Sequence, residues 1–248
     1  MAVPTQPMLP VLALDTSTES IAAGLQTGRA AFHAQVPGGA LASRALMPCL
    51  QALLVQAGLR WADIQAIAFG RGPGAFTGLR TACAVAQGLG FGLARPLLPL
   101  DSLLIVAEDA HAQAGAPAQW DVSVAMDARM DEVYAARYRW QQGQWCVLEA
   151  PALLSLAQLA DRWAAAAPGA LAGSALAAFA GRLPLPAGVP CFTQEQHRAA
   201  ALLRLAVRAV EAGAGVDAAE ALQLYLRDKV ALTTDERLAA RQPQRTSA

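Results

Sequence analysis

The residues whose types and spacing best suit chemistry lie in one glycine-rich stretch, Ala68–Arg80. Four glycines and a proline fall within nine residues of it. An apolar run precedes the stretch and an alanine-rich helical pattern follows it, so we expect a strand, a tight turn and a helix capped by Thr77. Glycine lets a ligand or another segment approach the backbone closely. The turn therefore suits either an anion held at the helix N-terminus or a tightly packed partner segment.

A second candidate is the polar turn that follows the first apolar run of the chain, Asp15-Thr16-Ser17-Thr18. Such a turn can face a phosphate, or it can close a strand through side-chain-to-backbone hydrogen bonds. Both interpretations are open from the residues alone. Asp127 occupies the same place after the first predicted strand of the second half, with Arg129 two residues beyond it. This mirroring indicates a duplicated fold more than catalysis.

The histidines and cysteines are too scattered to predict a metal site. A site within one segment needs ligands at close spacing, commonly two histidines four residues apart. The three histidines, His33, His111 and His197, have no other His or Cys within five positions. We therefore predict no metal site and no catalytic residue. The cysteines stand among apolar neighbours, so we expect buried free thiols in a reducing compartment: Cys49, Cys83, Cys146 and Cys191.

The composition describes a chain with ample core and balanced charge. It is 55% hydrophobic and 15% charged with zero formal net charge, which excludes a disordered chain and gives no general basic surface for RNA. No apolar run reaches the roughly 18–20 residues that span a bilayer, and the first residues lack a secretory pattern, so we expect a cytoplasmic protein. The basic residues near the end form either a solvated tail or a tRNA contact: Arg227, Lys229, Arg237, Arg241 and Arg245.

The elements that must position these residues occur in the same order twice. The first half predicts strands at 10–14, 21–25 and 30–34, a helix at 41–57, a strand at 64–69, a helix at 77–92, a strand at 96–100 and a helix at 101–113. The second half predicts strands at 122–126, 133–138 and 145–148, a helix at 155–166, a strand at 170–173, and helices at 174–181 and 197–213. This order favours a duplicated α/β fold. We expect one lobe over 1–114, a second over 115–230 and a flexible polar tail over 231–248.

Four segments carry a resemblance to a known family. Leu14–Glu19 resembles the first phosphate motif of the actin/hexokinase/Hsp70-type (ASKHA) fold. Gly70–Arg80 with Ala84–Leu89 resembles the TsaB (YeaZ) family, and Ala125–Tyr134 and Leu224–Asp228 resemble its later signatures. These matches extend over nearly the whole chain. The sequence departs from the family at Ala42, where a histidine is usual, and at Gln223, where a proline is usual.

The resemblance implies duplicated ASKHA lobes and a non-catalytic subunit in the synthesis of N6-threonylcarbamoyladenosine at position 37 of tRNAs that read A-starting codons. It implies a heterodimer with the transferase TsaD, the ATPase TsaE as a further partner, a homodimer when alone, and tRNA contact only through the complex. In a working member of the fold, Asp15 would hold a metal-bound water, but Thr16 replaces the usual glycine. We expect no cofactor of the chain's own, with ADP or ATP only at the partner interface. The vestigial phosphate-loop positions are Asp15, Thr16, Ser17, Thr18, Gly72 and Gly74.

The helices at 41–57 and 77–92 are rich in alanine and glycine, whose small side chains allow close helix packing. This composition serves either internal packing or an interface with a second chain. The candidate interface residues are Ser43, Leu46, Leu50, Arg71, Phe76, Thr77, Arg80, Cys83, Ala84 and Gln87. The alternative function is a stand-alone enzyme, a peptidase or a small-molecule kinase, although no Ser/His/Asp order or H-x-x-x-H pattern supports a peptidase.

Overall fold

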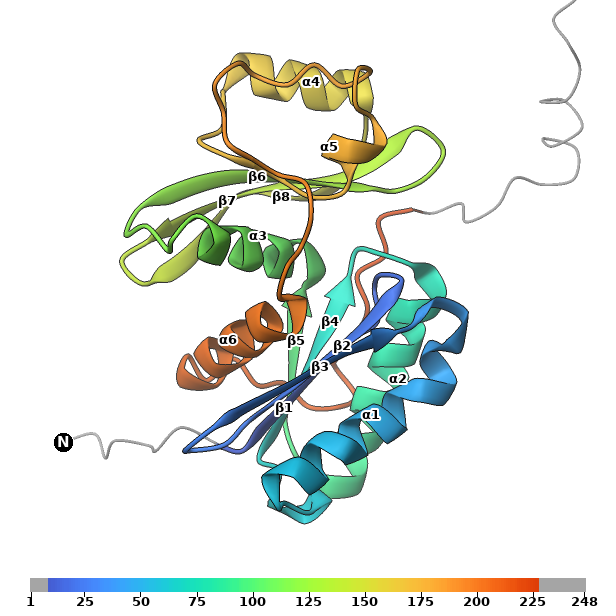
Figure 1. Ribbon diagram of the computed structural model, residues 1–248. Helices are drawn as coiled ribbons and strands as arrows, with labels where there is room; N and C mark the ends of the chain where they lie inside the picture. Colours follow the sequence, from blue (N-terminus) through green and yellow to red (C-terminus); the bar gives the residue numbers. More distant parts are fainter. Residues whose placement is uncertain (1–8, 228–248) are drawn as a thin grey trace, which may run out of the picture.

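The computed structural model describes residues 9–227, which form two α/β lobes (Figure 1). The strands of the first sheet are β1 (Val11–Asp15), β2 (Ser20–Gln26), β3 (Ala31–Pro37), β4 (Ala66–Gly72) and β5 (Leu97–Asp101). Those of the second are β6 (Trp120–Asp127), β7 (Glu132–Gln141), β8 (Gln144–Ser155), β9 (Leu171–Ala172) and β10 (Cys191–Phe192). The helices are α1 (Ala42–Ala57), α2 (Phe76–Leu93), α3 (Ser102–Gln113), α4 (Leu156–Ala165), α5 (Ala175–Ala178) and α6 (Arg198–Glu211), with short 3₁₀ turns η1 (Gly39–Leu41) and η2 (Trp61–Asp63).

The two sheets have the same topology. The first has the order β3-β2-β1-β4-β5, and the second, taken from its β8 edge, has the matching order β8-β7-β6-β9-β10. In both, the first three strands pair antiparallel and the last two join in parallel. A helix follows the third, fourth and fifth strand of each half. The predicted duplication of an α/β unit is therefore confirmed.

The last helix of each half packs on the sheet of the other half. Helix α3 contacts β6 and β7, and α6 contacts β1 and β2. Leu202, Leu203 and Ala206 of α6 share one buried cluster with Val11 and Ala13 of β1. The two helices also contact each other, so they form the layer between the two sheets (Figure 1). Because each helix covers apolar residues on the sheet of the other half, this exchange of helices holds the two lobes together.

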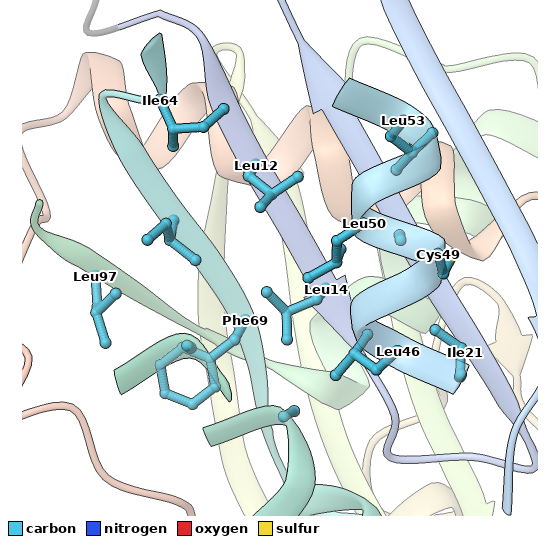
Figure 2. Close-up of a cluster of buried hydrophobic side chains, with 14 of the residues drawn as sticks. Leu12, Leu14, Ile21, Leu46, Cys49, Leu50, Leu53, Ile64, Phe69 and Leu97 are labelled. Carbon is cyan, nitrogen blue, oxygen red and sulfur yellow. The ribbon is translucent and has the colours of Figure 1, made fainter. Parts of the chain in front are cut away.

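The main core of the first lobe lies between its sheet and helices α1 and α2. Leu46 and Leu50 of α1 approach Leu12 and Leu14 of β1 (Figure 2), and all four side chains are fully buried. Their spacing along the helix places them on one face, as an amphipathic helix requires. Burying this face stabilises the lobe through removal of apolar area from water.

Helix α1 is more apolar than its core face requires. Gly39–Ala57 has 19 residues and is long and apolar enough, by length and composition, to cross a membrane. An 18-residue window within it has a mean hydropathy of 1.3, and 28% of that window is buried. The sequence predicts no such span, since Arg44 and Pro48 interrupt the run. Part of this additional apolar character comes from Met47 and Val55, whose side chains are exposed on the same helix. One face of α1 thus builds the core, and another presents apolar surface.

Three features differ from the predicted organisation. The short strand β10 has no signal in the sequence, because two residues are too few for a periodic pattern. The segment that contains the last family signature, at 222–226, has no regular secondary structure. The predicted second lobe, 115–230, includes α6, but α6 packs on the first sheet. The predicted tail, 231–248, lies outside the described residues.

The cysteines match the prediction of free thiols but not of uniform burial. All four are free; Cys49 and Cys83 are buried, Cys146 is half-buried and Cys191 is exposed. Burial raises the pKa of the Cys83 thiol, so this side chain behaves as a small apolar group.

Candidate functional site

The glycines of the loop between β4 and α2 make room for the turn after β1. A Cβ on Gly70 would lie 1.7 Å from the Asp15 Oδ2 atom. A Cβ on Gly78 would lie 1.8 Å from the Thr16 carbonyl oxygen, and the Thr16 hydroxyl donates to the Gly78 carbonyl at 2.6 Å. The space that these two glycines leave beside the backbone is therefore filled by residues of the same chain.

The same holds at the remaining glycines of the loop. A Cβ on Gly74 would lie 2.7 Å from Ser17, and the Ala75 N–H donates to the Ser17 carbonyl at 2.8 Å. Gly72 has a φ of +113° and lies against the Leu224 carbonyl, 2.7 Å from the position of its missing Cβ. Of the two sequence interpretations, tight packing of a partner segment is the one that the structure supports at these positions.

The start of α2 also differs from the prediction. Thr77 lies inside the helix, where its neighbour Thr81 donates to its carbonyl at 3.0 Å. The N-cap is Ala75, which has no capping side chain. The Ser17 carbonyl, in the turn after β1, accepts from the N–H of this N-cap residue.

Asp15 is the centre of a buried hydrogen-bond network. Its Oδ1 accepts from the Ser17 N–H at 3.1 Å and from the Ser17 hydroxyl at 2.9 Å. Its Oδ2 accepts from the Ser102 hydroxyl at 3.3 Å, and that hydroxyl accepts from the Gly72 N–H at 3.0 Å. The network thus ties together the end of β1, the glycine loop and the start of α3.

Arg198, the first residue of α6, completes this network with a positive charge. Its Nε donates to Asp15 Oδ1 at 3.0 Å and one terminal nitrogen donates to the Ser17 hydroxyl at 2.9 Å. Its other terminal nitrogen donates to Glu195. The side chain is 3% exposed, and that of Asp15 is 0% exposed. A buried charge needs such a partner, because water no longer solvates it.

The pKa shifts follow from this burial and pairing. Burial lowers the pKa of Arg198, but the carboxylates of Asp15 and Glu195 raise it by more, so the guanidinium stays charged. Burial raises the pKa of Glu195 against the opposing effect of Arg198. Two carboxyl groups thus compete for one guanidinium.

A cleft of about 620 Å³ opens beside this network, between the two lobes. Ser17 and Pro73 line it from the first lobe, Met126 and Ser174 line it from the second, and Arg198 of α6 also lines it. Asp127 at the end of β6 mirrors Asp15: the Arg129 N–H donates to Asp127 Oδ1 at 2.8 Å, as the Ser17 N–H does to Asp15. The sequence prediction of mirrored strand-end turns is confirmed in their geometry.

The closing segment, Ala221–Arg227, runs along α2 and then crosses to the second lobe. The Leu224 N–H donates to the Arg71 carbonyl at 2.7 Å, and the Tyr225 ring lies 5.1 Å from that of Phe76. Arg227 pairs with Glu132 and donates to the Ala128 carbonyl at 3.1 Å. The segment therefore bridges the lobes along one side of the cleft.

The predicted interface residues divide into three groups. Leu46, Leu50 and Cys83 are buried in the core of the first lobe, so a second chain cannot reach them. Phe76, Arg80 and Gln87 hold the closing segment: Arg80 donates to the Tyr225 hydroxyl at 3.3 Å, and Gln87 donates to the Ala221 carbonyl at 3.1 Å. The other four members, Ser43, Arg71, Thr77 and Ala84, are exposed, as Arg80 is.

Other exposed residues were missed as interface candidates. Met47, Val55 and Phe91 are apolar side chains on α1 and α2 that are 39%, 68% and 63% exposed. The helical period of the buried leucines could have predicted them, because apolar residues that lie off the buried face of a helix are free to contact another chain.

Sequence reasoning also missed Arg198 and Glu195. One signal existed: an arginine in the first turn of a helix opposes the helix dipole, so it needs a specific anionic partner. That partner, Asp15, lies far away in the sequence. The histidines do not meet; among residues 9–227, no three His, Cys, Asp or Glu side chains converge as metal ligands.

Comparison with known proteins agrees with these features. Residues 38–243 match the family model described as "TsaD: tRNA N6-adenosine threonylcarbamoyltransferase". An Escherichia coli protein named tRNA threonylcarbamoyladenosine biosynthesis protein TsaB is 36% identical over 162 residues, 62% of this chain and 68% of the relative. The chain belongs to the TsaB (YeaZ) family. The ASKHA-type fold predicted from the motifs is thereby confirmed as well.

Two further TsaB (YeaZ) relatives extend the comparison. A Haemophilus influenzae protein of the same name is 38% identical over 126 residues, which are 51% of this chain and about half (52%) of the relative. The solved structure of YeaZ from Pseudomonas aeruginosa is 40% identical, with a TM-score of 0.78, and the match covers 88% of this chain and 100% of that one. The two-lobed arrangement is therefore shared within the family.

Proposed function

We propose that this chain is a non-catalytic subunit in the synthesis of threonylcarbamoyladenosine in tRNA. Its role is to bind and activate the transferase TsaD in the cytoplasm, together with the ATPase TsaE, and it meets tRNA only within that complex. The names of the E. coli and H. influenzae relatives support the pathway. The chain holds no metal or nucleotide of its own.

The observation that carries the non-catalytic role is the filling of the glycine loop. Gly70, Gly74 and Gly78 give their space to the turn at 15–17, and Gly72 gives its space to Leu224. Such close contact with the same chain supports a loop that packs segments together rather than one that holds a phosphate group.

The surface offered to the partner is the exposed side of α1 and α2, which we call the α1–α2 face. It carries the apolar residues Met47, Val55 and Phe91 and the small residue Ala84. Apolar groups on a helical surface with small side chains fit close helix packing against another chain. When the partner is absent, a second copy of this chain fits the same face and gives a homodimer.

The test combines reconstitution with a surface variant. With TsaD, TsaE, ATP, preformed threonylcarbamoyl adenylate and tRNA, we expect modified adenosine when the chain is present and none from the chain alone. Val55→Asp places a charge on the α1–α2 face and should weaken the TsaD complex by about tenfold or more. Light scattering with the purified partner measures this loss.

The matched control is Val147→Asp on β8, where the valine is 60% exposed in the other lobe. It should leave the complex intact. Modification of tRNA by the isolated chain would contradict the non-catalytic role. Equal binding by Val55→Asp and the unmodified chain would reject the α1–α2 face.

A further inference from the structure

We infer that Arg198 supplies, from within the chain, the positive charge that a bound divalent cation would supply at Asp15, so that the cleft binds no magnesium–nucleotide complex there. The fold family implies a metal-bound water at this aspartate. The residues present do not fit one: both Asp15 oxygens are already bonded, and a guanidinium occupies the position in front of them.

The geometry around Arg198 is that of a site built for one cation. Each of the three guanidinium nitrogens meets an oxygen, from Asp15, from Ser17 and from Glu195. Oxygen atoms of carboxylates and hydroxyls are also the ligands that Mg²⁺, Mn²⁺ and Ca²⁺ prefer. The guanidinium is thus surrounded by the donor set of a hard metal ion.

Arg198 cannot leave this position while the fold is intact. It is the first residue of α6, whose apolar face is buried against β1, β4 and β5. A solvent cation exchanges with its site, whereas this charge is fixed by the packing of a 14-residue helix. The exchange of helices between the lobes therefore also closes the site at Asp15.

This inference deepens the cofactor part of the proposed function, and its test uses the chain alone. Thermal unfolding is measured with and without Mg²⁺ or Mn²⁺, and with and without ADP. A ligand that binds the folded state raises Tm by mass action. The unmodified chain should show no rise with any of these additions.

Arg198→Ala vacates the position and leaves Asp15 buried without its countercharge. Its Tm should fall by on the order of 10 °C, since losing one partner of a buried pair is strongly destabilising. Mn²⁺ should then recover part of the loss. Asp15→Asn with Arg198→Ala removes the Asp15–Arg198 pair and leaves Glu195, whose pKa burial raises, as the remaining carboxyl group of the network. The double variant should therefore be more stable than Arg198→Ala and should respond less to Mn²⁺.

The matched control is Arg204→Ala on the same helix. Arg204 pairs with Glu108 but is 38% exposed, and Arg208 remains to pair with Glu108. This variant should lose less stability and should not respond to cations.

Three outcomes would overturn the inference. The first is a rise in the Tm of the unmodified chain with Mg²⁺–ADP. The second is a double variant no more stable than Arg198→Ala, including the case in which neither folds, because Arg198 would then matter for packing rather than charge. The third is an Arg198→Ala variant that folds and shows no Mn²⁺ response. The reconstitution assay with TsaD is unaffected by any of these results.

Discussion

At the scale of single residues, the glycines of the loop leave space that atoms of neighbouring segments occupy. Gly70 is the tightest, with Asp15 in the space of its missing side chain. The backbone of β4 can lie beside the Asp15 carboxylate only because residue 70 has no Cβ. Substitution at this loop thus tests packing between segments of the first lobe.

Gly70→Ala should lower the free energy of unfolding by about 3 kcal/mol, because the added methyl group forces Asp15 out of its network. The control is Gly88→Ala in α2, where an added Cβ meets nothing within 4 Å. Alanine inside a helix is favoured over glycine by up to about 1 kcal/mol, so the control should be neutral or stabilising. Urea unfolding followed by circular dichroism measures both. A Gly70→Ala variant as stable as the control would show that Asp15 does not need the space at Gly70.

Asp101 provides a prediction of pH dependence at the same scale. Burial raises its pKa, while hydrogen bonds from the Tyr138 hydroxyl and the Leu103 N–H oppose the rise. A raised folded pKa means that the folded state holds the proton more tightly than the unfolded chain, where Asp titrates near about 3.9. The contribution is therefore favourable in acid and is lost as the pH rises through the folded value.

The measurement compares the unmodified chain with Asp101→Asn from pH 3.5 to 6.5. The stability advantage of the unmodified chain should be largest at the acidic end and should shrink toward pH 6.5. A constant difference over this range would show that Asp101 does not titrate differently in the two states.

At the scale of elements, the closing segment stabilises a strained turn in the second lobe. Arg129, Met130 and Asp131 all have positive φ, at 66°, 56° and 58°. A non-glycine residue in this conformation costs roughly 1–2 kcal/mol. Arg227 contacts the turn from outside through the Ala128 and Arg129 carbonyls and through Glu132.

Arg227→Ala should therefore loosen this turn. The Ala128 N–H donates to the Glu132 carbonyl at 2.9 Å, and the Glu132 N–H donates to the Arg129 carbonyl at 3.2 Å. Hydrogen exchange at these two amides should become about tenfold faster, equivalent to roughly 1.4 kcal/mol of local stability. The control is Arg182→Ala, because Arg182 pairs with Asp131 where both side chains are exposed, and such pairs contribute little. Unchanged exchange in Arg227→Ala would show that the turn holds its shape without the closing segment.

At the scale of the whole molecule, the lobes are joined behind the cleft by Glu108 of α3. Its carboxylate accepts from Trp145 of the second sheet at 2.7 Å and from Arg208 of α6 at 2.8 Å, and it pairs with Arg204. Trp140 lies beneath Arg208 at 4.5 Å. With the exchanged helices, this contact leads us to expect that the two lobes unfold as one cooperative unit.

Glu108→Gln weakens the joint without removing the exchanged helices. We expect a loss of about 2 kcal/mol, discounted because Arg204 and Arg208 are partly solvated. Unfolding should remain a single transition, with tryptophan fluorescence and circular dichroism giving the same midpoint. Separate midpoints for the two probes would show that the lobes unfold independently.

Much of the fold could be predicted from the sequence because its signals are local. Short apolar runs, strand alternation and helical period predict β1 to β9 and the long helices. The contacts that decide the site are not local: Arg198 lies 183 residues from Asp15, and Leu224 reaches Gly72 from the far end of the chain. No pattern of neighbouring residues distinguishes a glycine that receives a phosphate from one that receives another segment.

The interface candidates show the same limit. The period of α1 identifies Leu46 and Leu50 as one face, but the period does not say which face meets the sheet. Burial assigns the leucines to the core and leaves Met47 and Val55 outside. The sequence therefore predicts that α1 is apolar, but only the packed structure shows which of its apolar residues face the core and which face outward.

The exchange of final helices also constrains how the polypeptide emerges from the ribosome. The side of the first sheet formed by Val11, Ala13, Ala66 and Ala68 is covered by α6, which starts only at residue 198. A nascent chain that ends at residue 114 presents this apolar surface bare, and such surface promotes aggregation. Translation must continue through almost the whole second half before α6 can cover this face of the first sheet. Premature termination should therefore yield fragments that aggregate rather than a folded first lobe.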